Sequence, residues 1–296
     1  MRLKYEMVIH HAIVNNLFRW QYTKKSCNAQ GSSKYYLFVT APFFMYNEME
    51  VMNMIYITGD THGNQFKWLE QIDPILKEGD IIIVCGDFGI GFFQQKYSSE
   101  ESFYDFISEQ PYTVLFIDGN HENFNLLNSY QVESWNGGYV HKIRHNLIHL
   151  MRGEIYTIEG KTFFTFGGGY SIDQPLRKEN VSWWPQEMPS KQEYENGLQH
   201  LDSVDHVDYI ITHTAPDETV YFLSTIKKYH IKGDVYQEFP LTTYLNDVQK
   251  KTSYTHWYFG HFHIDRELWR NQTALFNTIY ECESHRIIKQ WNTYEC

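Results

Sequence analysis

Five short apolar segments organise the sequence after residue 53, and each is followed at once by a loop rich in glycine, aspartate and histidine. They are residues 54–58, 80–85, 112–117, 209–212 and 256–259. Helical patterns separate the first three, which predicts strands joined by right-handed crossovers in a parallel sheet. The apolar runs are continuous, as is typical of strands covered on both faces. These features restrict the chain to an α/β fold.

Helix signals lie between and after these strands. Residues 64–77 carry apolar side chains at helical spacing, and Pro74 is expected to kink or shorten this helix. The side chains expected on its inner face are Phe66, Leu69, Ile72 and Leu76. Capping boxes that start at Ser98 and Ser190 predict that two further helices begin there.

The second half of the chain also contains antiparallel signals. Residues 154–158 and 162–166 flank Glu159-Gly160-Lys161, which predicts a hairpin. Residues 267–289 are expected to form antiparallel strands. Residues 54–296 are therefore predicted to form one α/β domain with a mixed or double sheet under helices.

Residues 1–53 differ from the rest. They carry six basic and three acidic residues, and we expect either a genuine extension or an artefact of an upstream start, with translation beginning near Met54. Their apolar stretch, residues 35–46, is short and broken by Pro42, so no membrane span is predicted. The cysteines show no CxxC spacing, which favours thiols in a reducing, cytoplasmic location; they are Cys27, Cys85, Cys282 and Cys296.

The charge of the chain limits its partners. The 25 basic and 36 acidic residues give a net charge of −11. Without residues 1–53, 19 basic and 33 acidic residues remain, a net charge of −14. This balance argues against a broad basic face for nucleic acid. The 15 histidines are the more informative feature, because histidine is the commonest metal ligand.

The loops after the five strands carry metal-ligand residue types. In an open α/β sheet such loops converge on one crevice, so we expect their side chains to meet in space. The side chains are Asp60, His62, Asp87, Asp118, Asn120, His121, Glu122, His213, His261 and His263. Any one of them could equally be a turn former or a helix cap. As a set without thiolates they suit Mn, Fe, Zn, Co or Ni and disfavour a structural zinc site.

A further histidine series recurs at spacing four, at His141, His145 and His149. On a helix these side chains would share a face, but residues 140–150 fit a strand equally well. We expect them not to be ligands.

The ordered blocks Gly59-Asp60-Thr61-His62-Gly63, Gly86-Asp87, Gly119-Asn120-His121-Glu122, His213 and Gly260-His261-Phe262-His263 resemble those of the calcineurin-like metallophosphoesterase superfamily, in a small bacterial-type member. The resemblance implies two mixed sheets sandwiched by helices, with a dinuclear metal centre at the sheet edge. It assigns Asp60, His62 and His263 to one metal, Asp87 to both, and Asn120, His213 and His261 to the second. His121 matches the histidine that contacts the substrate phosphate and assists the leaving group.

One block departs from the Ser/Thr protein phosphatase branch, whose pattern is GDxVDRG. Residues 86–92 lack both the aspartate that supports the histidine and the phosphate-binding arginine. We hypothesise that Arg177 replaces this arginine and that Trp183 and Trp184 wall the cleft. The alternatives are a surface charge for Arg177 and packing roles for the tryptophans.

The sequence therefore predicts a hydrolase of phosphate esters that uses two divalent ions, with Mn favoured in vitro and a water between the ions as nucleophile. A phosphomonoesterase is favoured, and a phosphodiesterase acting on nucleotides or nucleic acid is the first alternative. The second alternative is an inactive scaffold. That alternative predicts eroded ligands, and none of the seven positions is eroded.

Overall fold

The computed structural model of the chain describes residues 53–92, 97–226 and 235–291. Residues 1–52 of the predicted extension, which include Cys27, lie outside these ranges, and so does Cys296. The predictions for these residues stay predictions. The unit that contains the described residues runs from Val51 to Cys296. No helix within the described ranges is long and apolar enough to cross a membrane.

The first sheet has eight strands in the order β14-β13-β1-β2-β3-β6-β5-β4. Its parallel centre is β1 (Ile55–Thr58), β2 (Ile81–Val84), β3 (Thr113–Phe116) and β6 (Leu147–Leu150). Antiparallel strands flank it, namely β4 (Val132–Trp135), β5 (Gly138–Lys142), β13 (Thr278–Glu281) and β14 (Arg286–Gln290). This sheet is therefore mixed, and the predicted parallel order of its first three strands is confirmed.

The second sheet has six strands in the order β11-β12-β10-β9-β8-β7. They are β7 (Glu154–Ile158), β8 (Lys161–Phe166), β9 (His206–Thr212), β10 (Ser253–Phe259), β11 (Arg266–Leu268) and β12 (Gln272–Ala274). The middle four are parallel, and β7 and β11 pair antiparallel at the edges. The predicted hairpin is the β7–β8 pair, and its turn has positive φ at Glu159 and Gly160.

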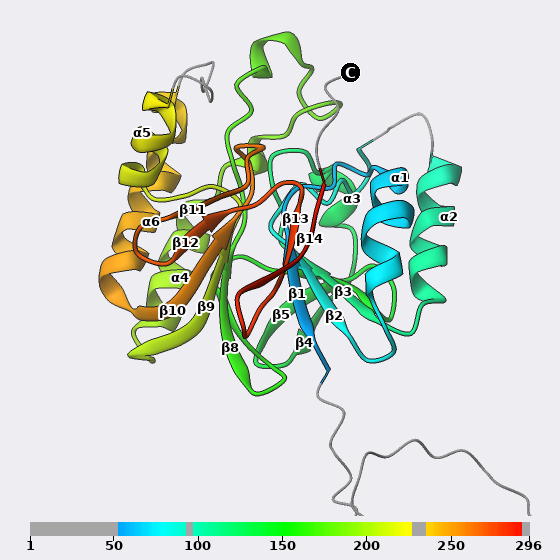
Figure 1. The fold of residues 1–296 in the computed structure, drawn as a ribbon. Coiled ribbons are helices and arrows are strands. Elements are labelled where there is room, and N and C mark those ends of the chain that lie inside the picture. The colour runs from blue at the N-terminus through cyan, green and yellow to red at the C-terminus, as the bar shows by residue number, and fades with distance from the viewer. Residues whose placement is uncertain (1–52, 93–96, 227–234, 292–296) are drawn as a thin grey trace, which may run out of the picture. The chain divides into compact units, whose positions relative to one another are not determined.

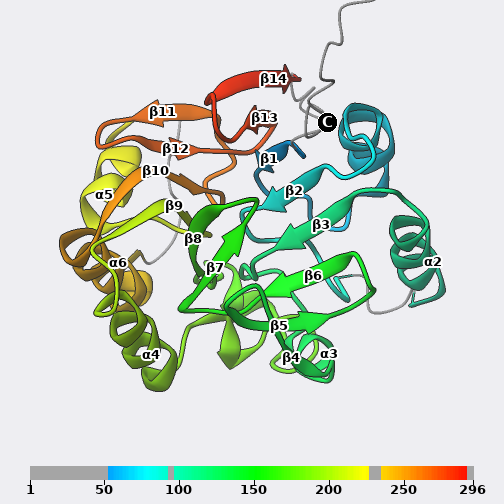
Figure 2. The same ribbon diagram turned by 90° about the horizontal axis from the view of Figure 1, so that it is seen from below.

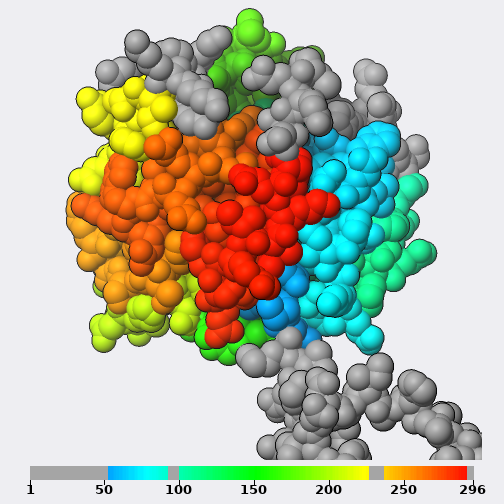
Figure 3. All heavy atoms as spheres, in the orientation of Figure 1, coloured from blue at the N-terminus to red at the C-terminus, as the bar shows by residue number. Residues whose placement is uncertain are grey.

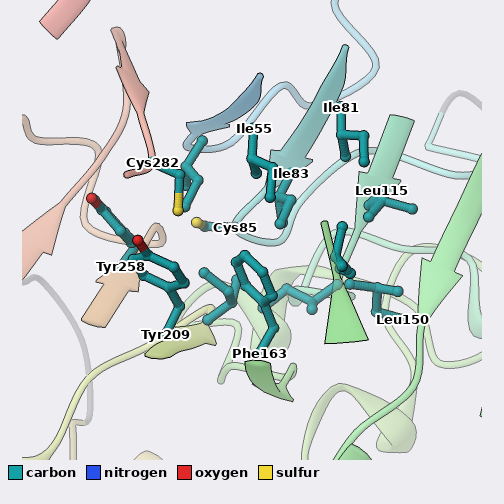
Figure 4. Packing of buried hydrophobic residues seen from close by; sticks show 14 of the residues in the cluster. Ile55, Ile81, Ile83, Cys85, Leu115, Leu150, Phe163, Tyr209, Tyr258 and Cys282 are labelled. Atoms are coloured by element: carbon teal, nitrogen blue, oxygen red, sulfur yellow. The ribbon is translucent and has the colours of Figure 1, made fainter. Parts of the chain in front are cut away.

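The continuous apolar strands are explained by burial on both faces. Along β2, Ile81 and Ile83 pack into the core between the two sheets, whereas Ile82 and Val84 pack beneath the helices on the outer side. Successive side chains of a strand point to opposite faces, so a strand in such a layer has to be apolar throughout. Figure 4 shows the core between the sheets, where Ile83 and Leu115 lie opposite residues of the second sheet.

Helices cover the outer faces of both sheets (Figures 1 and 2). On the first sheet lie α1 (Gln65–Lys67), α2 (Tyr97–Ser108) and α3 (Phe124–Leu127); on the second lie α4 (Lys191–Leu201), α5 (Asp217–Thr225) and α6 (Phe239–Lys251). The predicted fold class, two mixed sheets sandwiched by helices, is confirmed. In Figure 3 the C-terminal strands β13 and β14, in red, form part of the surface between the orange and blue segments.

One predicted helix face is confirmed only in part. Ile72 is buried as predicted and Leu76 packs against the core, whereas Phe66 and Leu69 are exposed and Trp68 is buried instead. The helix is α-helical only over Gln65–Lys67 and continues as a π-helical turn, Trp68–Ile72, which a 3-10 turn containing Pro74 follows. The wider π turn shifts the side chains relative to α-helical spacing, so Trp68 faces the sheet where Phe66 and Leu69 were expected.

The other local predictions have mixed outcomes. Ser190 caps α4 through the predicted capping box with Glu193. Helix α2 begins at Tyr97, so Ser98 lies inside it and not at its cap. His141 and His149 lie on neighbouring strands β5 and β6, which settles the open alternative in favour of strands. Cys85 and Cys282 are buried free thiols, as expected.

Candidate metal centre

The eight side chains to which the resemblance assigns a role lie in the loops that follow β1, β2, β3, β9 and β10. Both sheets present the carboxyl ends of these parallel strands on the same side of the molecule, where such loops converge. In Figure 1 these ends point upward, and the segment of residues 167–189, in green, rises above them. The topology therefore brings together side chains that are up to 203 residues apart in the sequence, from position 60 to position 263.

Asp60, His62 and His263 form the first group. Asp60 is fully buried, and its Oδ2 lies 3.1 Å from Nε2 of His263 and 3.7 Å from Nε2 of His62. The two Nε2 atoms are 2.9 Å apart. Three potential ligand atoms from two loops thus face one point, all within 4.8 Å of one another.

Asp87 lies between this group and a second one. Its Oδ2 is 3.7 Å from Nδ1 of His62, whereas its Oδ1 is 3.4 Å from Nε2 of His213. A carboxylate can offer one oxygen to each of two cations and reduce their mutual repulsion. The position of Asp87 is the one that the resemblance predicts for a shared ligand.

The second group contains His213, Asn120 and His261. Nδ1 of His213 lies 2.9 Å from the carbonyl oxygen of Cys85, which leaves Nε2 for the site, 3.1 Å from Oδ1 of Asn120. The rings of His213 and His261 are 4.9 Å apart between centroids. The backbone N–H of His261 donates to Oδ1 of Asp60 at 3.0 Å, which connects the second group to the first. The second group therefore adjoins the first. The potential ligand atoms grouped within 4.8 Å of one another belong to Asp60, His62, Asp87, His121, His213 and His263, and those groups do not include His261.

The electrostatics of this pocket favour positive charge. Burial by itself raises the pKa of both carboxyls, but the neighbouring imidazoles lower the pKa of Asp60 and hold that of Asp87 well below its usual value. Burial lowers the pKa of His213, yet Asp87 and Asp60 raise it overall to about 10. The buried carboxylates of Asp60 and Asp87 are therefore negatively charged where little solvent reaches them, and this charge favours the binding of cations.

The residues present fit a pair of divalent ions. Oδ2 of Asp60 is buried and, among the described residues, receives no aligned hydrogen bond. An unsatisfied buried carboxylate oxygen is costly unless a cation binds it. Imidazole nitrogens together with carboxylate and amide oxygens suit first-row divalent metals. When bound, such ions supply Lewis-acid charge that polarises a phosphoryl group and promotes ionisation of water.

The sequence model of the calcineurin-like phosphoesterases matches residues 54–265, which span the chain from β1 to the loop after β10. The chain belongs to the calcineurin-like phosphoesterase family. No curated protein matches the chain in sequence. Membership of this family implies a metal-dependent phosphoesterase, and a dinuclear metal centre is typical of it.

In this calcineurin-like phosphoesterase, His121 lies beside the candidate ligands His62 and Asp87 and contacts Arg177. Both terminal nitrogens of Arg177 are 3.2 Å from Nδ1 of His121, and Nη2 is also 2.8 Å from a carboxylate oxygen of Asp173. Burial, aided by Arg177, lowers the pKa of His121 to about 4, although Asp87 acts in the opposite direction. The structure thus places the predicted substitute arginine next to the predicted catalytic histidine.

The two tryptophans have different environments. Trp184 is only 5% exposed and packs in the core beneath the helices of the first sheet. Trp183 is partly exposed in the turn that also holds Arg177. Trp184 therefore has a packing role, and Trp183 is the more exposed of the pair.

Backbone strain accumulates at the centre. Four of the seven ligands have left-handed backbone conformations, with φ of 50° at His62, 50° at Asp87, 66° at His261 and 51° at His263. Such conformations are costly for non-glycine residues and cluster at functional sites. Gly86 allows the loop after β2 to approach the ring of His213 closely, because a Cβ at this position would lie 2.1 Å from Nδ1 of His213.

Sequence reasoning missed the residues that support the ligands. Nδ2 of Asn120 donates to Oγ of Ser171 at 3.0 Å, and a carboxylate oxygen of Glu238 lies 3.3 Å from Nε2 of His261. Ser171 follows the glycine-rich run at residues 167–169, which was a weak signal. Glu238 lies just before a helix and gave no signal in the sequence, because its role depends on a contact with His261 in a distant loop.

A second missed feature is the buried ion pair of Asp118 and Arg152. Nε of Arg152 donates to Oδ2 of Asp118 at 2.9 Å, and its Nη2 donates to the carbonyl oxygen of Gln186 at 2.8 Å. Nε2 of His149 lies 3.1 Å from the other oxygen of Asp118. This pair fixes the loop after β3, which contains Gly119 and Asn120, against the segment of residues 167–189.

Proposed function

We propose that this phosphoesterase hydrolyses phosphate monoesters with two divalent ions, Mn among those that suit the site. Asp60, His62 and His263 would hold one ion and Asn120, His213 and His261 the other, with Asp87 shared between them. The observation that carries the proposal is the position of Asp87, whose two carboxylate oxygens face the two ligand groups separately.

His121 and Arg177 would act on the substrate. A ring N–H of His121 would donate to a phosphate oxygen or to the departing alkoxide, which reduces the charge that develops there. The Arg177 guanidinium, held by Asp173, would bind a second phosphate oxygen. Trp183, in the same turn, would contact the organic part of the ester.

Charge favours the monoester over the diester. A phosphate monoester is a dianion near neutral pH, whereas a diester carries a single negative charge, so the added cation of Arg177 benefits the monoester more. The net charge of −14 for residues 54–296 supports small or protein-borne phosphates over nucleic acid. The buried free thiols Cys85 and Cys282 support a reducing, cytoplasmic location.

A rate comparison tests the proposal. The full chain is loaded with Mn²⁺, and the kcat/KM values for p-nitrophenyl phosphate and bis-p-nitrophenyl phosphate are measured under the same conditions. The proposal expects faster hydrolysis of the monoester. A faster diester would shift the function to phosphodiester hydrolysis, and absence of both activities in protein that binds Mn²⁺ would favour an inactive scaffold.

A further inference from the structure

Glu238 is a buried carboxylate that its own helix does not use. It occupies the N-cap position of α6 but makes no side-chain capping hydrogen bond there, and Pro240 follows at the start of the helix. Only 5% of the residue is exposed. A buried carboxylate without partners is costly, so the placement of Glu238 has to be explained by what its side chain contacts.

The contacts of Glu238 lie in two loops next to the metal centre. Its Oε1 accepts a hydrogen bond of 3.1 Å from the backbone N–H of Tyr170, in the segment after β8. The same oxygen lies 3.3 Å from Nε2 of His261, in the loop after β10. The carboxylate therefore joins two loops that neither strand pairing nor the family blocks connect.

Tyr170 also belongs to the surroundings of the second ligand group. Its neighbour Gly169 lies so close to this group that a Cβ there would be 3.1 Å from the ring of His213, 3.2 Å from Oδ1 of Asn120 and 3.4 Å from the ring of His261. Glu238 thus contacts residues of the second group and of the loop next to it. Among the described residues, no hydrogen bond or ion pair joins Glu238 to the side chains of the first group.

The contact with Glu238 determines which nitrogen of His261 is available. A neutral imidazole has one N–H and one lone pair, and a carboxylate next to Nε2 favours the proton on that nitrogen. Nδ1 then keeps its lone pair for an ion. Histidines that bind metals commonly donate their other ring N–H to a carboxylate, which fixes the ring and raises its basicity.

We propose that Glu238 is a positioning residue for the second ion, acting by holding His261 as the Nε2–H tautomer with Nδ1 directed to the metal. The inference rests on the two-ion site of the proposed function. It adds a residue outside the five sequence blocks, contributed by the segment immediately before α6.

The first test reads the tautomer directly. Two-bond ¹H–¹⁵N spectra of the metal-free full chain, with the His261 signals assigned from a His261→Gln variant, are expected to show the Nε2–H form. Glu238→Ala is expected to shift the His261 signals toward the tautomer mixture of a free neutral imidazole, and Glu238→Gln to retain the wild-type signals, because the amide oxygen still accepts from Nε2–H. An unchanged tautomer ratio of His261 in Glu238→Ala would overturn the inference. A loss of stability alone in that variant would not support it, because a purely structural role of Glu238 would leave the tautomer of His261 unaltered.

The second test measures metal binding. Mn²⁺ titration calorimetry of the wild type is expected to show two equivalents, and Glu238→Ala to weaken one of them about 10- to 100-fold while the other stays unchanged. Glu238→Gln should recover much of the loss. Glu218→Ala, which removes a surface carboxylate paired with Arg270, is the matched control and should bind as the wild type does.

Equal binding by Glu238→Ala and the wild type would contradict the inference. Failure of the proposed function has a different signature: no ester hydrolysis by a wild type that still shows the Nε2–H tautomer and binds two equivalents of Mn²⁺.

Discussion

The amide of Asn120 is held by Ser171: its Nδ2 donates to Oγ of Ser171 at 3.0 Å, and its Oδ1 therefore faces Nε2 of His213. An amide has two ends of nearly equal size, and only the oxygen can bind a cation. Ser171 is buried, so no water competes for this bond. A hydroxyl outside the ligand set thus decides which atom of Asn120 faces the metal centre.

Replacement of Ser171 by alanine is expected to weaken binding of the second Mn²⁺ about tenfold, because the amide loses the partner that fixes its orientation. Titration calorimetry of the metal-free full chain measures this change. Ser224→Ala is the control, since Ser224 lies partly exposed on α5 and its Oγ donates to the carbonyl oxygen of Tyr221. Unchanged affinity in Ser171→Ala would show that Asn120 is oriented without it.

Asp60→Asn is expected to abolish turnover and to lower the amount of bound metal. The substitution replaces a buried anionic oxygen that lies next to His62 and His263 with a neutral amide. Metal analysis and p-nitrophenyl phosphate hydrolysis measure both effects. Asp247→Asn, in an exposed pair with Lys250, should change neither. A variant of Asp60 with nearly full activity would refute the assigned site.

Arg177→Ala is expected to lower kcat/KM about 10- to 100-fold for every phosphate ester, equivalent to the loss of a charged hydrogen bond of about 1.5–3 kcal/mol. Metal content should not change, because Arg177 contacts His121 and no assigned ligand. Arg144→Ala removes another arginine, one that pairs with Glu101 and Asp105, neither of which is an assigned site residue, and serves as the control. Wild-type values of kcat/KM in Arg177→Ala would show that Arg177 is a surface charge that does not bind the substrate.

Arg152→Ala is expected to lower the free energy of unfolding by about 3–5 kcal/mol, because it leaves the Asp118 charge buried without its partner. Urea unfolding of the full chain measures this loss. The double variant Arg152→Ala with Asp118→Asn should recover part of the stability, since the unpaired charge is then gone. A loss of less than about 1 kcal/mol would indicate that the pair behaves as an exposed one.

His256 is expected to make the protein less stable as the pH falls. Burial, together with the nearby His285, lowers the pKa of His256 to about 3, below the ordinary value of 6.5. The folded state therefore favours the neutral ring. This contribution to stability is fully present above pH 6.5 and is lost as the pH falls toward the folded pKa.

Unfolding free energies at pH 7, 6 and 5 test this expectation. Below pH 6.5 the wild type should lose stability relative to His256→Gln by no more than about 1 kcal/mol per pH unit, since the ring is partly exposed. Parallel pH profiles of the two proteins would show that His256 does not contribute.

The strands were predictable because they depend on local signals, and the seven candidate ligands were proposed from the ordered blocks that resemble the family. An apolar run such as residues 80–85 has to be buried on both faces, and the glycines beside Asp60 and Asp87 mark tight turns at strand ends. The inner face of residues 64–77 was predictable only in part: Ile72 is buried as expected, but a π-helical turn brings Trp68 inward and leaves Phe66 and Leu69 exposed. The difference between Trp183 and Trp184 was equally hidden, since adjacent residues in a loop have no periodic signal.

The sequence by itself determined the layered α/β fold and which side chains are candidate metal ligands, because strand burial and loop chemistry are encoded within a few residues. Only the tertiary structure decided how those ligands are held. Ser171 orients Asn120, Glu238 contacts His261, and Arg177 reaches His121. Each of these contacts joins residues between 23 and 56 positions apart. These contacts depend on how loops from the two sheets pack against one another, and no local sequence pattern predicts that packing.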